Sequence, residues 1–177
     1  TIMDLKDYIR SIKDYPKKGI LFRDITTLIK NETAFEETIN QIVERSKKFK
    51  LDKIAAIESR GFVFASAVSY ILKKPFIMLR KKNKLPSDTH SVDFELEYGK
   101  ATIEVHKDSI KKNDKVLIID DLIATGGTAE AAAKLVNISH GKVAGFIFVI
   151  NLFDLSGSDN LRKQNYKVEN LIEFPGH

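Results

Sequence analysis

Hydrophobic and polar positions along the chain alternate between short apolar runs and stretches with helical spacing. The apolar runs, which predict buried strands of the kind found in parallel sheets, lie at residues 54–57, 76–79, 116–119 and 143–152. Helical spacing predicts helices that begin near Phe62, near Gly127 and at Thr33, where Thr33 and Glu36 have capping-box spacing. Because strands and helices alternate, we expect an α/β fold in which one parallel sheet carries helices on both faces.

The amino-terminal segment lies outside this alternation. Residues 4–15 have apolar positions at helical spacing, so we expect a helix that Asp4 caps and Pro16 ends. Residues 1 to about 30 are therefore expected to form a small cap over a site on the main sheet.

A polar stretch at residues 80–91 contains Pro86 and has no apolar period, which predicts a long surface loop. Alternation at residues 100–106 predicts a half-buried strand. Residues 168–174 predict a last strand. Since no linker divides the chain, we expect residues 1–177 to form a single domain.

The composition is typical of a soluble globular protein, with 43% hydrophobic and 30% charged residues. The chain has no cysteine, which is compatible with a reducing compartment, and we expect a cytoplasmic location. Residues 1–10 do not resemble a signal peptide, and the longest apolar run is far shorter than the ~18 residues that span a bilayer. The net charge of +5 suits either nucleic acid or a polyanionic small substrate.

The strand at residues 116–119 ends in two adjacent carboxylates, Asp120 and Asp121. A turn of small residues follows and opens an alanine-rich helix; it consists of Ala124, Thr125, Gly126, Gly127 and Thr128. Ligands of open α/β sheets bind at the carboxyl ends of strands, and the free N–H groups of a helix N-terminus favour phosphate. Because carboxylates repel phosphate, the acids should face sugar hydroxyls or a metal. A ribose 5-phosphate meets both requirements.

The acidic pair and the turn resemble the signature with which type I phosphoribosyltransferases bind 5-phosphoribosyl-1-pyrophosphate (PRPP). No lysine follows the glycines and no G-x-G-x-x-G opens a helix, so other phosphate motifs do not fit. The resemblance covers residues 15–152 and implies a Rossmann-like phosphoribosyltransferase fold. It implies that the 124–128 backbone and the hydroxyls of Thr125 and Thr128 hold the 5-phosphate, while Asp120 and Asp121 bind the ribose hydroxyls.

Two further segments resemble the diphosphate-binding parts of adenine-specific members of this family. Residues 58–62 resemble the diphosphate loop, which implies that Ser59 and Arg60 contact diphosphate oxygens. The basic stretch from residue 80 resembles the start of a flexible catalytic loop, which the resemblance places at about residues 80–101. It implies that Arg80, Lys81 and Lys84 approach the diphosphate and that the loop excludes water.

The remaining matches concern the purine base. Glu97 and Tyr98 belong to a Glu-Tyr-Gly motif in which the resemblance makes Glu97 the general acid/base. Phe22 and Arg23 match the adenine-pocket pattern, so that Phe22 would stack on the purine and the Arg23 backbone would read its edge. The chain departs from the family at Phe94, where most relatives have tyrosine.

The resemblance implies a purine-salvage enzyme that transfers the phosphoribosyl group from PRPP to adenine, giving AMP and pyrophosphate, and that forms a homodimer. The four histidines share no ligand spacing, so Mg²⁺ is expected to be held mainly by substrate oxygens and water. Two alternatives stay open: an enzyme for another purine base, and a nucleotide-sensing RNA-binding regulator on the same fold. We expect no nucleic-acid partner and no membrane association. We also expect no added DNA-binding domain, because the chain begins directly at the cap segment.

Overall fold

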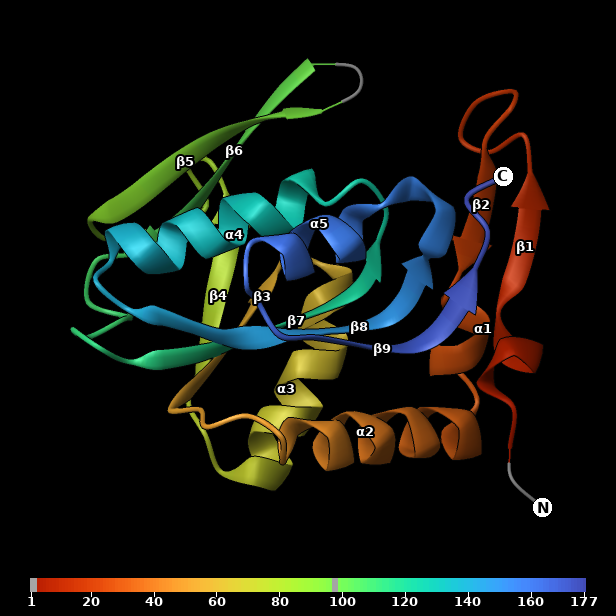
Figure 1. Cartoon of the computed structure of the whole chain (residues 1–177), viewed down its shortest axis with the longest axis horizontal. Helices are drawn as coiled ribbons and strands as arrows, with labels where there is room; N and C mark the ends of the chain where they lie inside the picture. Colours follow the sequence, from red (N-terminus) through yellow and green to blue (C-terminus); the bar gives the residue numbers. More distant parts are fainter. Residues whose placement is uncertain (1–2, 97–98) are drawn as a thin grey trace.

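The computed structural model describes residues 3–96 and 99–177 and has a seven-stranded sheet at its centre, with the spatial order β5-β6-β4-β3-β7-β8-β9 (Figure 1). The strands of this sheet are β3 (Lys53–Ile57), β4 (Phe76–Lys81), β5 (Thr89–Leu96), β6 (Gly99–His106), β7 (Lys115–Ile123), β8 (Lys142–Leu152) and β9 (Val168–Phe174). The strands β4, β3, β7, β8 and β9 are parallel, whereas β6 pairs antiparallel with both β4 and β5. The expected α/β fold is confirmed, with one correction: the sheet is mixed, because one edge is an antiparallel arm formed by β5 and β6.

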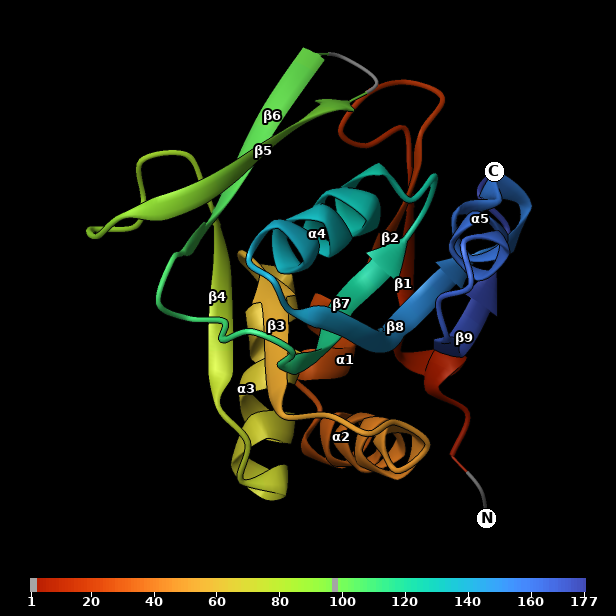
Figure 2. The ribbon, with the colours of Figure 1, turned by 60° about the vertical axis from the view of Figure 1, so that its left-hand side comes forward.

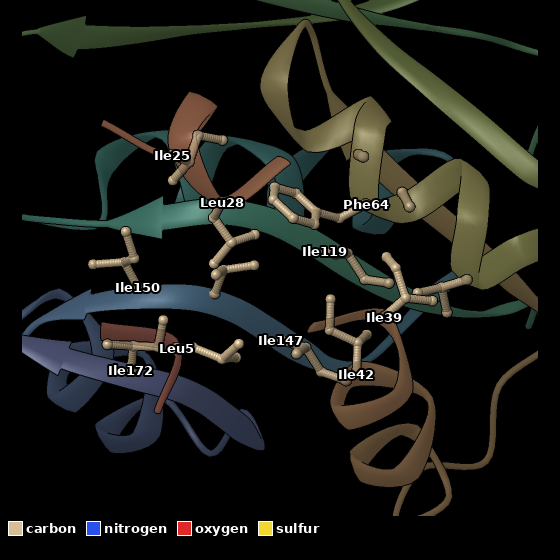
Figure 3. Close-up of a cluster of buried hydrophobic side chains, with 14 of the residues drawn as sticks. Leu5, Ile25, Leu28, Ile39, Ile42, Phe64, Ile119, Ile147, Ile150 and Ile172 are labelled. Atoms are coloured by element: carbon tan, nitrogen blue, oxygen red, sulfur yellow. The ribbon is translucent and has the colours of Figure 1, made fainter. Parts of the chain in front are cut away.

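Helices lie on both faces of the sheet, with α2 and α3 on one face and α4 on the other (Figures 1 and 2). The helices are α1 (Thr26–Ile29), α2 (Glu32–Ser46), α3 (Arg60–Leu72), α4 (Gly127–Ile138) and α5 (Gly157–Lys163), with 3-10 turns η1 (Leu5–Tyr8) and η2 (Phe153–Leu155). Ile119 of β7 is buried in one cluster with Phe64 and Ile42 (Figure 3), whereas the preceding Ile118 is buried in the other cluster with Leu135. Successive residues of this strand therefore face opposite sides, which is why its sequence is continuously apolar.

The amino-terminal helix predicted over residues 4–15 is wrong. Asp4 does cap a turn, since its side chain accepts the Lys6 N–H at 3.0 Å, but only η1 follows. The chain then forms β1 (Arg10–Lys13), which pairs antiparallel with β2 (Leu21–Asp24) in a separate two-stranded sheet. The backbone N–H and C=O groups of residues 10–13 are therefore hydrogen-bonded to β2 instead of within a helix.

Two predicted boundaries also shift. Helix α2 is capped by Asn31, whose side chain accepts the Ala34 N–H at 2.9 Å, so the capping box assigned to Thr33 is wrong. The loop predicted over residues 80–91 is shorter, because β4 continues through Lys81 and β5 begins at Thr89. Strand pairing with β6 extends both ends, and it leaves only residues 82–88 as a turn.

Candidate active site

A pocket of about 1040 Å³ opens at the carboxyl ends of β3 and β7, beside the arm formed by β5 and β6. Four segments line it: the turn between β3 and α3, the turn after β4, the arm, and the loop between β7 and α4. The predicted site residues that the pocket brings together are Ser59, Arg60, Lys81, Lys84, Asp120, Asp121, Ala124, Thr125, Gly126, Gly127 and Thr128. Segments far apart in sequence thus share one cavity, while the chemical role of each residue stays a prediction.

The loop between β7 and α4 is shaped by its glycines. Gly126 caps α4 with a left-handed backbone (φ +95°), a conformation that glycine adopts without steric cost. The helix begins at Gly127, so the N–H groups of its first turn, which have no intrahelical acceptor, lie at the pocket. The positive end of the helix dipole lies at the same place, and the arrangement is suited to an anion such as a phosphate monoester.

This loop is supported from outside the pocket by the start of α5. The Gly157 N–H donates to the Ala124 carbonyl at 3.1 Å. A Cβ atom at Gly157 would lie only 2.3 Å from that oxygen and 2.9 Å from the Gly126 nitrogen. The two backbones are therefore packed against each other with no room for a side chain, a contact that no sequence motif indicated.

The two acids of β7 occupy different environments. Asp121 is buried and accepts a hydrogen bond from Arg60 Nε at 2.6 Å, and its negative charge raises the pKa of Arg60. The Asp120 side chain lies against the start of α3, where a Cβ at Gly61 would come within 2.9 Å of its Oδ1. Burial, followed by repulsion from Asp121, raises the pKa of Asp120 well above its usual range. The pair therefore carries less negative charge than two free carboxylates would.

The last residue of β4 and the turn after it, together called the basic turn (residues 81–88), contribute three lysines to the pocket: Lys81, Lys82 and Lys84. Arg80 does not line the pocket; its guanidinium lies 3.5 Å from Glu58 Oε1, an oxygen that also accepts the Lys81 N–H at 2.6 Å. Burial raises the pKa of Glu58, but the Lys81 hydrogen bond and the Arg80 charge outweigh it and lower the pKa overall. An ionised Glu58 thus connects the turn to the end of β3.

Phe22 and Arg23 lie on β2 and are not among the residues that line this pocket. The Phe22 ring packs edge-on against Tyr15, with ring centroids 5.1 Å apart. The Arg23 guanidinium donates to the Pro175 carbonyl at 3.1 Å and lies over the Phe174 ring. The Phe22 side chain therefore packs within the amino-terminal segment, and the Arg23 side chain joins that segment to the end of β9. A role of either residue at a purine stays a prediction.

Glu97 and Tyr98 lie outside the described residues, so their predicted roles are not placed. Other arm residues line the pocket without having been singled out for a role; they are Asp93, Phe94, Glu95, Leu96, Lys100, Ala101, Thr102 and Ile103. The alternation at residues 100–106 indicated a strand, but only its pairing with β5 brings these side chains to the cavity.

Within residues 3–96 and 99–177, no group of three His, Cys, Asp or Glu side chains is placed to hold a metal ion. In the same part of the chain, none of the helices combines the length and hydrophobicity needed to cross a membrane.

Comparison with known proteins adds to this geometry. The family model described as "Phosphoribosyl transferase domain" matches residues 24–176. A protein from Pelagibacter ubique named adenine phosphoribosyltransferase is 82% identical over 175 residues, which cover 99% of this chain and all of the relative.

Solved structures agree. The adenine phosphoribosyltransferase of Thermoanaerobacter pseudethanolicus matches with a TM-score of 0.92 and 44% identity, covering 96% of this chain and 98% of that one. The enzyme of that name from Saccharomyces cerevisiae, in complex with adenine and an imino-altritol bisphosphate, matches with a TM-score of 0.86 and 34% identity, covering 94% and 96% of the two chains.

The mixed sheet, the glycine loop behind an acidic pair and the family match together define a class of enzyme that handles phosphoribosyl groups. The chain belongs to the phosphoribosyltransferase family and, within it, to the adenine phosphoribosyltransferases.

Proposed function

We propose that the pocket transfers the 5-phosphoribosyl group of PRPP to adenine, giving AMP and pyrophosphate. Adenine N9 forms a bond to C1 of the ribose while the bond from C1 to the diphosphate oxygen breaks. The single observation that carries the proposal is the convergence of an anion-binding loop, an acidic pair and a group of cations on one cavity. This set matches the three parts of PRPP: the monoester, the ribose diol and the diphosphate.

The 5-phosphate binds to the N–H groups of residues 124–128 at the start of α4, with the hydroxyls of Thr125 and Thr128 as further donors. The ribose hydroxyls bind beside Asp120 and Asp121. These contacts fix the sugar so that its C1 faces the base, and holding the reactants in line lowers the barrier.

The diphosphate binds to Arg60, Lys81 and Lys84, with the Ser59 hydroxyl nearby. Negative charge builds up on this leaving group as the C1–O bond breaks. Fixed cations in the pocket stabilise that charge more in the transition state than in the ground state. Arg80 acts behind them through its pairing with Glu58.

The base site is the part of the proposal that depends most on the resemblance. Glu97 exchanges a proton with the purine, Tyr98 lies beside it in the motif, and Phe22 and Arg23 hold the ring. Positioned proton transfer of this kind contributes roughly 10²- to 10⁴-fold in rate.

The residues of this site fit a Mg²⁺ ion that binds together with the substrate. In the described part of the chain, no three carboxylates or other metal ligands of the pocket are grouped, and of the adjacent pair Asp121 is bonded to Arg60 while Asp120 has a raised pKa. Such a donor set suits a cation that keeps most of its water and is held by diphosphate and ribose oxygens. When bound, the ion neutralises diphosphate charge.

The enzyme forms a homodimer through the outer face of α3. Val63, Tyr70 and Ile71 share this face, and their exposed fractions are 37%, 85% and 48%. Exposed aromatic and aliphatic side chains gathered on one helix face favour association with another copy of the chain. The reaction takes place in the cytoplasm, since a multiply charged sugar phosphate does not cross a bilayer unaided.

A panel of bases tests the proposal. The protein is incubated with PRPP, Mg²⁺ and adenine, hypoxanthine, guanine or xanthine, and nucleotide formation is followed. Turnover with adenine above all others supports the proposal, whereas turnover with guanine and none with adenine contradicts it. RNA filter binding at several salt concentrations tests the regulator alternative, because RNA affinity falls steeply with salt.

A further inference from the structure

Glu104 is a buried carboxylate on β6 that has no part in the proposed reaction. The residue is 8% exposed and is not among those that line the pocket. Its Oε1 accepts the Asn83 N–H at 2.9 Å, and its Oε2 accepts the hydroxyls of Ser91 at 2.6 Å and Thr89 at 3.2 Å. A buried carboxylate with three donors on one segment of chain holds that segment in a defined conformation.

The three donors belong to the turn after β4 and to the strand that follows it. Asn83 lies inside the turn, between two lysines of the pocket, and has a left-handed backbone with φ +68°. Thr89 and Ser91 belong to the first three residues of β5. Glu104 itself pairs across the sheet with Arg80, near the end of β4. One side chain therefore connects the end of β4, the turn and the start of the arm.

A second carboxylate, Glu58, holds the start of the same basic turn. Glu58 accepts the Lys81 N–H at 2.6 Å, and Glu104 accepts the Asn83 N–H two residues later. The backbone of Lys82 lies between these two fixed points. A lysine ammonium group lies at the end of a flexible stem, so the space that it can reach is set by where its backbone is held.

We propose that Glu104 is a positioning residue that aims the lysines of the basic turn at the diphosphate of PRPP. The inference rests on the proposed function, since it assumes that Lys81 and Lys84 contact that diphosphate. It adds a residue outside the pocket whose loss weakens PRPP binding while adenine binding is unchanged.

The test compares Glu104→Ala with Glu104→Gln. Alanine removes the acceptors of all three donors. Glutamine keeps one oxygen for the Asn83 N–H, and its amide can donate to the two hydroxyls, which rotate to accept. We expect kcat/KM for PRPP to fall about ten- to a hundred-fold in Glu104→Ala, as for other small misplacements of binding groups, with the KM for adenine unchanged. Glu104→Gln should restore most of the loss.

Asp114→Ala is the matched control. Asp114 likewise accepts a backbone N–H, from Lys111 at 2.7 Å, and it forms an ion pair with Lys53 at 2.7 Å. It precedes the amino-terminal end of β7, whereas the carboxyl end of that strand lines the pocket. This variant should lower the thermal unfolding temperature without a selective change in the KM for PRPP. If Glu104→Ala behaves in the same way, or if Glu104→Gln is as impaired as Glu104→Ala, the positioning role is overturned.

A double variant, Thr89→Val with Ser91→Ala, covers the case in which Glu104→Ala does not fold. It keeps the carboxylate and removes two donors, so a smaller but selective rise in the KM for PRPP supports the inference, and an unchanged KM overturns it. Calorimetric titration with PRPP separates the inference from the proposed function. A wild-type protein that binds PRPP but does not convert adenine refutes the function, while the variants still report on the turn.

Discussion

The Arg60 guanidinium and the Asp121 carboxylate form a direct ion pair, with Nε 2.6 Å from Oδ2. Arg60 begins α3 and Asp121 lies near the end of β7, and both line the pocket. The proposed reaction assigns Arg60 to the diphosphate and Asp121 to the ribose. In the free protein, Arg60 and Asp121 therefore bond to each other, and the proposed reaction predicts that PRPP binding exchanges this ion pair for contacts with the substrate.

Replacing Arg60 with glutamine tests this exchange. The variant removes a charged donor from the diphosphate, and a hydrogen bond to a charged group contributes roughly 1.5–3 kcal/mol, so the KM for PRPP should rise about ten- to a hundred-fold. The fold should also lose some stability, because the variant leaves the buried Asp121 carboxylate without its cation, although the Arg60 side chain is itself 57% exposed. Steady-state kinetics and thermal unfolding provide the two readouts. Arg45→Gln, which removes an arginine paired with Glu169, is the control and should leave the KM unchanged.

Asp120 predicts a pH-dependent stability. Its folded pKa is raised above the ordinary value of 3.8, first by burial and then by Asp121. When the pH rises above 3.8, the unfolded chain releases this proton while the folded protein still holds it. The contribution of Asp120 to the free energy of unfolding therefore falls as the pH rises toward the folded pKa. Asp120→Asn, which is neutral in both states, should therefore gain in unfolding temperature relative to wild type as pH rises above the ordinary carboxyl pKa of 3.8.

Asp159→Asn controls for the removal of a carboxylate, because Asp159 is 64% exposed and lies on α5. Its unfolding temperature should track wild type across the pH series. A constant difference between Asp120→Asn and wild type at every pH would show that Asp120 is ionised in the folded protein, contrary to the prediction.

Gly157→Ala should disturb the phosphate loop from behind. The new methyl group would lie 2.3 Å from the Ala124 carbonyl oxygen, so the loop or the start of α5 must move. We expect a loss of about 1–3 kcal/mol in the free energy of unfolding, as for other overpacked sites, together with a raised KM for PRPP. Ser158→Ala, next to it in α5, adds no atoms and should raise the KM less. Equal KM values in the two variants would mean that the loop tolerates the methyl group.

The sequence was sufficient for the core of this fold where local patterns and burial agree. The run at residues 116–119 is apolar at every position because β7 is covered on both faces, and it was predicted as a buried strand. Residues 4–15 show why pattern alone fails elsewhere. Their apolar spacing suits a helix, but Ile12 pairs with Phe22 across the hairpin, a long-range contact that spacing does not encode.

The site shows the same division. Asp120, Asp121 and the turn behind them are contiguous in sequence, so their shared location could be predicted. Gly157 and Glu104 could not, since each acts through a backbone contact with a segment more than twenty residues away. The placement of Phe22 and Arg23 beside Tyr15 and Phe174, away from the pocket lining, likewise depends on tertiary packing.

Glu97→Ala tests the proposed proton transfer. If Glu97 is the general acid/base at the purine, the variant should lose roughly 10²- to 10⁴-fold in kcat, while its unfolding temperature and its affinity for PRPP stay near wild type. Glu95→Ala is the control, because Glu95 is two residues away in the sequence and lines the pocket from β5 but has no assigned role. Rates are measured at saturating adenine and PRPP. A variant with wild-type kcat would remove Glu97 from the mechanism.

Tyr70→Glu tests the proposed dimer. Tyr70 is 85% exposed on α3, on the face it shares with Val63 and Ile71, and a carboxylate placed in an apolar interface there must give up its water. We expect the wild type to sediment as a dimer and the variant as a monomer in analytical ultracentrifugation. Ile138→Glu on α4 is the matched control: Ile138 is 42% exposed but lies on the opposite face of the sheet, so this variant should remain a dimer. If both variants stay dimeric, a surface other than α3 joins the subunits, since one charge at the centre of the proposed contact cannot be accommodated.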